Sequence, residues 1–140
     1  MANVVLIGAT GFVGSAILNE LLSRGHKVTA VVRNAAKLPQ NDNLTAVEED
    51  VANVDAIANI AKGKDAVISS YNPGWNNPQM GKINDENYPK IVEAVKKSGV
   101  QRLLIVGGAG TLFVKPGVRV VDTGVIPDAI IDGVRSLGNF

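Results

Sequence analysis

Short β-branched segments alternate along the chain with segments whose apolar residues recur at helical spacing. Strands are expected at residues 4–7, 28–32, 44–47, 66–68 and 103–106. Helices are expected at residues 11–24, 54–61 and 83–97, with a short helical turn at residues 34–38. The first strand segment, residues 4–7, is apolar throughout, which is typical of a strand buried on both faces of a parallel sheet. The alternation predicts an α/β fold, a doubly wound, three-layer αβα sheet of about five parallel strands in the order 3-2-1-4-5.

The C-terminal part of the chain departs from this alternation. A loop is expected at residues 107–117, a short strand at residues 118–121 and a helix at residues 127–137. The chain has 140 residues, of which 46% are hydrophobic and 19% charged, an ordinary globular composition. Since no linker-like or low-complexity segment interrupts it, residues 1–140 are predicted to form a single domain.

Charge and composition exclude several classes of function. Fourteen basic and 13 acidic residues give a net charge of +1 without a dense basic run, which argues against a nucleic-acid partner. The absence of cysteine excludes disulfides and thiolate chemistry, and a single histidine argues against a metal cluster or a Ser-His-Asp triad. No apolar run is long enough to span a membrane and no signal peptide is recognisable, so we expect a cytoplasmic protein without a membrane partner.

Three glycines mark the passage from the first expected strand into the start of the first expected helix. Gly8 permits a tight turn, Gly11 lets the backbone approach a pyrophosphate, and Gly14 lets the helix pack against the strand. The free N–H groups and the positive dipole end of the helix then face the phosphates. In this strand–turn–helix context, the spacing predicts a nucleotide-binding Rossmann-type domain.

Several segments of the chain resemble sequence motifs of one known protein family. The sequence GATGFVG at residues 8–14 resembles the fingerprint of extended and atypical short-chain dehydrogenases/reductases. The segments AVVRN at 30–34, EDV at 49–51, DAVISSYNPG at 65–74 and VGGAG at 106–110 resemble the NAD(P)-binding, NADH-flavin reductase-like or epimerase-like family. The resemblance covers essentially the whole chain and implies a dinucleotide cofactor.

The resemblance assigns candidate cofactor contacts residue by residue. From the loop these are Gly8, Thr10, Gly11, Phe12, Val13 and Gly14, and from the later strand ends they are Arg33, Asp50, Val51, Ser69, Ser70 and Tyr71. Arg33 stands where NAD-preferring proteins carry an acidic residue, so we expect NADP rather than NAD; the alternative is a solvated arginine at a strand end. Asp50 would meet the adenine amino group and Val51 the ring, unless Asp50 is only a carboxylate at a helix N-terminus.

The turn-rich loop after the fourth expected strand contains the candidate substrate residues. Asn72 and Trp75, the only tryptophan, could contact a flat acceptor such as a flavin or quinone. Alternatively, Trp75 packs on its own turn.

No catalytic residue is assigned. The family's tyrosine-lysine pair with four-residue spacing is absent, because Trp75 follows Tyr71 and Val92 follows Tyr88 at that spacing. The preferred function is therefore hydride transfer from the nicotinamide to a small acceptor, since the cofactor supplies that chemistry. The alternatives are an epimerase/dehydratase-like enzyme, a non-catalytic dinucleotide-sensing regulator and an inactive fragment.

Related proteins normally continue beyond the region that matches residues 126–140. We therefore expect the C-terminal substrate lobe to be missing and one edge of the sheet to stay open, unless residues 118–121 cover it. This predicts a homodimer formed through the tail or the sheet edge, or else a low unfolding midpoint.

Overall fold

The computed structural model describes residues 1–73, 77–107, 112–128 and 130–137. Internal contacts divide the chain into two compact units. Unit 1 comprises Met1–Tyr71 and Lys90–Val106, and unit 2 comprises Asn72–Pro89 and Gly107–Phe140. One of the three boundaries along the chain follows Pro89, inside a helix.

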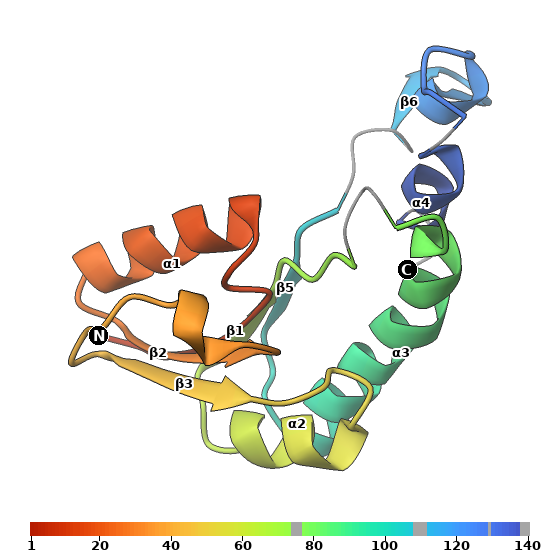
Figure 1. The fold of residues 1–140 in the computed structure, drawn as a ribbon. Coiled ribbons are helices and arrows are strands. Elements are labelled where there is room, and N and C mark those ends of the chain that lie inside the picture. The colour runs from red at the N-terminus through yellow and green to blue at the C-terminus, as the bar shows by residue number, and fades with distance from the viewer. Residues whose placement is uncertain (74–76, 108–111, 129, 138–140) are drawn as a thin grey trace. The chain divides into compact units, whose positions relative to one another are not determined.

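Unit 1 contains a five-stranded parallel sheet in the order β3-β2-β1-β4-β5, which confirms the predicted Rossmann-type topology (Figure 1). The strands are β1 (Asn3–Ile7), β2 (Lys27–Val32), β3 (Leu44–Glu48), β4 (Ala66–Ser69) and β5 (Leu103–Ile105). The connecting elements are α1 (Phe12–Ser23), the 3₁₀ turn η1 (Ala35–Lys37), α2 (Val54–Ala61) and α3 (Met80–Ser98). Figure 1 shows α1 and α2 on opposite sides of this sheet, as right-handed crossovers require.

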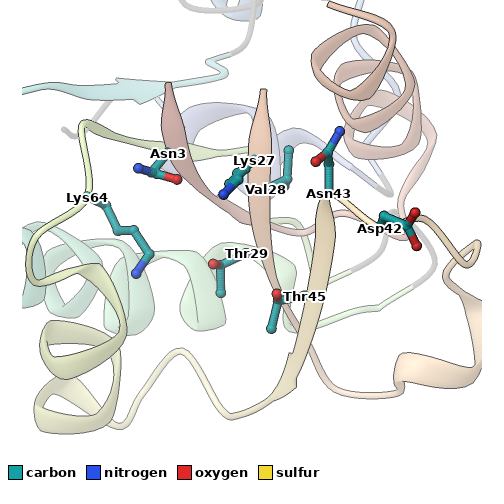
Figure 2. A pocket seen from close by; sticks show the side chains of 8 residues that line it. All are labelled: Asn3, Lys27, Val28, Thr29, Asp42, Asn43, Thr45 and Lys64. Carbon is teal, nitrogen blue, oxygen red and sulfur yellow. The ribbon is translucent and has the colours of Figure 1, made fainter. Parts of the chain in front are cut away.

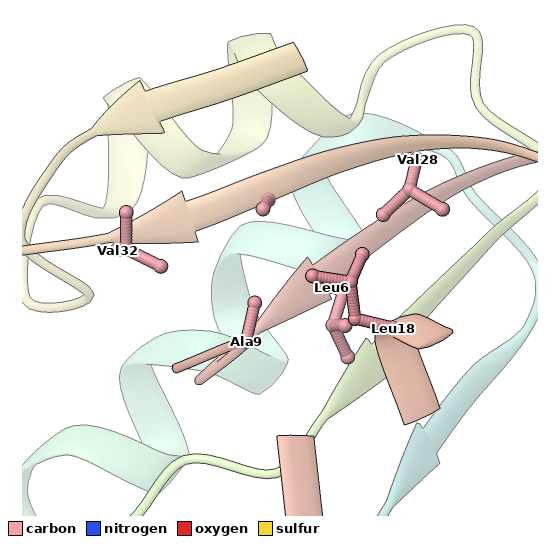
Figure 3. Close-up of a cluster of buried hydrophobic side chains, with 6 residues drawn as sticks. Leu6, Ala9, Leu18, Val28 and Val32 are labelled. Carbon is pink, nitrogen blue, oxygen red and sulfur yellow. The ribbon is translucent and has the colours of Figure 1, made fainter. Parts of the chain in front are cut away.

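The alternation of side chains along the strands determines which residues form the core. On β2, Val28, Ala30 and Val32 face α1 and join Leu6, Ala9 and Leu18 in one buried cluster (Figure 3). Lys27, Thr29 and Val31 consequently point to the other face, because successive strand residues alternate between faces. Removing a large aliphatic side chain such as Leu6 or Leu18 from water stabilises a fold by about 1.5–3 kcal/mol.

Unit 2 contains elements that the periodicity did not predict. The strands β6 (Phe113–Lys115) and β7 (Val118–Arg119) form an antiparallel hairpin, although residues 107–117 were expected to be a loop. The turn between them contains Pro116 and Gly117, and Gly117 has a φ of +79° that favours glycine. Val118–Arg119 therefore pairs with β6 and not with the edge of the five-stranded sheet.

The helical boundaries in unit 2 also differ from expectation. The 3₁₀ turn η3 (Val120–Asp122) follows β7, and α4 covers only Ile131–Ser136 of the helix expected at residues 127–137. The helix expected at residues 83–97 begins earlier, at Met80, where the Asn77 side chain accepts a hydrogen bond from the Gln79 N–H at 2.9 Å. Within the described ranges, no helix has the length and hydropathy needed to cross a membrane.

Candidate functional site

The strand register brings the predicted cofactor residues of unit 1 to one edge of the sheet. Ile7 pairs with Val31 on one side and with Ser69 on the other. The segments that follow these three residues leave the sheet together at its carboxyl edge, the edge at which open α/β sheets bind ligands. Gly8 and Ser70 are therefore neighbours.

The turn after β1 has the geometry that its glycines suggested. Gly8 has a φ of +83°, and its N–H donates to the Val31 carbonyl oxygen at 3.4 Å. The Gly11 N–H donates to the Gly8 carbonyl oxygen at 3.2 Å, which closes the turn. A Cβ on Gly8 would lie 2.8 Å from the Ser70 carbonyl oxygen, so both the backbone angle and the space require glycine there.

Gly14 packs directly against this turn. A Cβ on Gly14 would overlap the carbonyl oxygen of Gly8 and would lie 2.7 Å from the Ser70 hydroxyl oxygen. Gly11 differs, because its Cβ would approach only the Gly8 carbonyl oxygen, at the ordinary contact distance of 3.6 Å. Gly14 is thus needed for the folded loop itself, whereas the space beside Gly11 is open.

Ser70 connects the loop to the end of β4. Its N–H donates to the Ile7 carbonyl oxygen at 2.9 Å. Its hydroxyl lies within hydrogen-bond distance of the carbonyl oxygens of Ile7, at 3.1 Å, and Gly8, at 3.2 Å. The sequence pointed to Ser70 as a cofactor contact, and the structure adds a packing role that residue type alone did not reveal.

The N-terminus of α1 is open for an anion. Gly11 is the N-cap residue and has no side chain to accept the first N–H groups of the helix. The first turn contains no acidic residue that would repel a phosphate. Thr10 and Val13 are exposed, and Phe12 is 96% exposed. The backbone donors and the helix dipole therefore face solvent at this point.

Arg33 and Asp50 lie at the same edge, beyond the ends of β2 and β3. Val32 pairs with Glu48, and the Glu49 N–H donates to the Val32 carbonyl oxygen at 3.1 Å. Arg33 is exposed and forms no ion pair with any residue that the structure describes. Its guanidinium is available to a ligand.

The side chain of Asp50 accepts a hydrogen bond from the Ala52 N–H at 2.8 Å, in the turn that precedes α2. Asn53 is the N-cap residue of that helix, and its side chain accepts from the Ala56 N–H at 3.2 Å. Asp50 is exposed and Val51 is buried. The helix-terminal role considered for Asp50 therefore belongs to Asn53.

The end of β4 contains the remaining candidates. Ser69 is fully buried, and its hydroxyl oxygen accepts a hydrogen bond from the Tyr71 N–H at 3.3 Å. Tyr71 is half-buried at the end of unit 1. Asn72, the first residue of unit 2, is exposed, and Trp75 lies outside the described residues.

Together, the parallel sheet, the glycine turn and the open helix N-terminus define a Rossmann-type dinucleotide-binding domain. The chain belongs to the NAD(P)H-binding family, whose model matches residues 8–130. It is therefore an NAD(P)-binding domain related to the short-chain dehydrogenases/reductases.

Known proteins support this assignment. The Bacillus subtilis protein YwnB is 37% identical over 135 residues, which cover 95% of this chain and 61% of YwnB. A crystal structure of a Bacteroides thetaiotaomicron protein, provisionally assigned as an epimerase, is 48% identical and has a TM-score of 0.87. The match covers 99% of this chain and 62% of the Bacteroides protein. A crystal structure of a Streptococcus pneumoniae protein, provisionally assigned as an NADH-flavin reductase, is 27% identical and has a TM-score of 0.78. The match covers 99% of this chain and 63% of that protein. The chain thus spans about three fifths of the length of these relatives.

Proposed function

We propose that this chain is the cofactor-binding part of an NADP-dependent oxidoreductase that reduces a small acceptor. The observation that supports dinucleotide binding best is the packed glycine turn, in which Gly14 leaves no room for a side chain and α1 presents uncapped N–H groups. A bound nicotinamide would supply the hydride. The protein's own residues bind the pyrophosphate, hold the ribose and orient the ring.

The preference for NADP rests on Arg33. Its exposed guanidinium follows β2 at the edge that contains the glycine turn, and no carboxylate of the described residues neutralises it. A planar guanidinium can make two charge-assisted hydrogen bonds to the 2′-phosphate of NADP. NAD has only a hydroxyl at this position and gains less from Arg33.

Asp50 and Val51 are proposed to bind the adenine, and Ser69, Ser70 and Tyr71 are proposed to line the ribose and nicotinamide. The buried hydroxyl of Ser69 and the bonded hydroxyl of Ser70 support these two serines as residues that shape the edge. Asn72 and Trp75 remain candidates for contact with an acceptor of the flavin or quinone class.

The experiment that tests cofactor choice is calorimetric titration with NADPH and NADH. The Arg33→Ala variant is expected to weaken NADPH binding by about 1.5–3 kcal/mol, the range for a hydrogen bond to a charged group, and to leave NADH little changed. Arg24→Ala is the matched control, because Arg24 is an exposed arginine at the other end of α1, paired with Glu20 at 2.8 Å. Equal affinity of the wild type for both cofactors would contradict the proposed role of Arg33.

An epimerase/dehydratase-like activity is the second candidate, and the 48% identity to the Bacteroides protein favours it. Within residues 1–140 no tyrosine is followed four residues later by a lysine, so this part of the protein does not itself supply the proton relay typical of such enzymes. Oxidation of NADPH in the presence of a flavin or quinone supports the reductase. Tight binding without net turnover of any acceptor supports a dinucleotide sensor, and isomerisation of a sugar nucleotide without net oxidation supports the epimerase.

Self-association through the edge of the sheet is the proposed oligomeric state. Within the described residues, β5 has β4 on one side only, and Leu104 is 46% exposed. Light scattering tests this proposal, and a monodisperse monomer would contradict it. The cytoplasmic location and the absence of nucleic-acid and membrane partners stay predictions, which cell fractionation and binding assays can test.

A further inference from the structure

A polar hollow of about 320 Å³ lies in unit 1 at the amino edge of the sheet. The strand starts Asn3 and Lys27 and the turns before β3 and β4 surround it, so it lies at the end of the strands opposite to the glycine turn. The lining residues are Asn3, Lys27, Val28, Thr29, Asp42, Asn43, Thr45 and Lys64 (Figure 2). The volume falls near the lower end of the usual range for small-molecule sites, about 300–1,000 Å³.

The strand register brings the polar groups together. Asn3 pairs with Lys27, and Thr29 pairs with Thr45. Lys27 and Thr29 are two residues apart on β2 and therefore share the face opposite to α1. On that face Val31, near the end of β2, is buried, whereas Lys27 and Thr29, nearer its start, are polar. Polar side chains therefore line this part of the face, whereas Val31, further along the same strand, belongs to the core.

The side chains around the hollow offer many unused donors. The side chains of Lys27, Thr29, Thr45 and Lys64 form no hydrogen bond or ion pair with any residue in the described ranges. The nearby Asp65 carboxylate already accepts the Asn3 N–H at 2.7 Å. Figure 2 shows the Asp42 carboxylate on the far side of the hollow, directed away from Lys64. Two ammonium groups and two hydroxyls are therefore left for a ligand.

We propose that this hollow is a second ligand site, specific for a phosphate group carried by a small molecule. Ammonium groups supply charge, and the threonine hydroxyls donate hydrogen bonds to the phosphate oxygens. The site is independent of the dinucleotide, because it lies at the opposite edge of the sheet and shares no residue with the glycine turn.

The test is an NMR titration of the whole chain with inorganic phosphate and, separately, with glycerol 3-phosphate, each against potassium chloride of equal ionic strength. The proposal predicts saturable shifts of the backbone signals of Thr29, Thr45 and Lys64. Shifts confined to residues 8–14 would mean that phosphate binds only the glycine turn, and would overturn the proposal. Stronger binding of glycerol 3-phosphate would identify a phosphate ester, whereas equal or weaker binding would identify free phosphate as the ligand.

Matched lysine variants complete the test. Lys64→Gln and Lys27→Gln should each weaken phosphate binding at the hollow about tenfold, since each removes one charge-assisted hydrogen bond. Lys62→Gln is the control, because Lys62 is an exposed lysine two residues from Lys64 that does not line the hollow. An equal loss in all three variants would show non-specific attraction to positive charge and would overturn the proposal.

Discussion

The two compact units of the chain are stabilised in different ways. In unit 1, alternating apolar residues of β1 and β2 form one buried cluster beneath α1, and Leu44 of β3 and Ile68 of β4 pack against it. In unit 2, a few close contacts join α3 to α4. A Cβ on Gly81 would lie 2.9 Å from the Asp132 carbonyl oxygen, and Asn84 donates to the Ser136 hydroxyl oxygen at 3.2 Å. The difference shows that a repeated pattern specifies one unit, whereas individual contacts specify the other.

The glycine turn of unit 1 is the exception to this contrast, because individual close contacts determine its structure. Substitution in this turn should lower the free energy of unfolding more than any other change considered below. Gly14→Val would force a side chain into the Gly8 carbonyl group and the Ser70 hydroxyl. We expect a loss of about 3 kcal/mol or more in the free energy of unfolding, the upper range for overpacking. Urea denaturation measures this loss. An unchanged midpoint would show that the turn can move aside without cost.

Two glycine substitutions at the α3–α4 contact of unit 2 should lower stability by different amounts. Gly81→Ala meets the backbone of Asp132 and should cost about 1–3 kcal/mol, as overpacking against immobile atoms does. Gly133→Ala meets the Met80 side chain, with its sulfur at 2.7 Å, and should cost less than about 1 kcal/mol because that side chain can rotate. Thermal melts of the two variants provide the comparison. Equal losses would contradict the proposed difference between backbone and side-chain neighbours.

Removing a single hydroxyl from the turn should have a smaller effect. Ser70→Ala removes a hydroxyl whose single proton is shared between the Ile7 and Gly8 carbonyl oxygens, for which we expect a loss of about 1 kcal/mol. Ser15→Ala is the control, since the Ser15 hydroxyl donates to the Phe12 carbonyl oxygen at 3.1 Å on an exposed surface. If the two variants have the same stability, the Ser70 hydroxyl does not support the turn.

The smallest expected effect is a pH dependence in unit 2. Hydrogen bonds from the side chain and the N–H of Arg119 hold the pKa of the Asp122 carboxyl below its ordinary value of 3.8. A lowered folded-state pKa stabilises the fold above the unfolded-state value, and this contribution disappears as the pH falls through the folded-state value. Asp122→Asn should therefore lower the melting temperature slightly at pH 7, and this difference should shrink as the pH falls below 3.8. A difference that is constant with pH would point to packing.

The sequence predicted most of unit 1 because each of its elements repeats a local pattern. Residues 54–61 form α2 with both predicted ends, and Leu44 and Ala66 begin β3 and β4 as expected. The glycine spacing likewise located the candidate site at the end of β1. Periodicity does not report contacts between distant residues, so it did not reveal that Ser70 fills the space beside Gly14.

Unit 2 was predicted less well for the same physical reason. The helix expected to begin at residue 83 begins at Met80, so Gly81 lies inside α3, where its missing side chain allows close approach to α4. The strand expected at residues 118–121 is present in part as β7, but its partner β6 was missed because three residues are too few to show an alternation. Short helices and strands that are stabilised by one contact with a neighbouring element produce no periodic pattern in the sequence.

The central claim, that the turn at residues 8–14 binds a dinucleotide, is tested most directly by titrating NADPH into the wild type and the Gly11→Val variant. A Cβ on Gly11 would meet only the Gly8 carbonyl oxygen, at 3.6 Å, and the backbone there is extended, so we expect the variant to fold and keep its circular dichroism spectrum. The same side chain would occupy the space through which a pyrophosphate approaches the backbone, so NADPH binding should be abolished. Unchanged NADPH affinity in a folded Gly11→Val protein would contradict the claim.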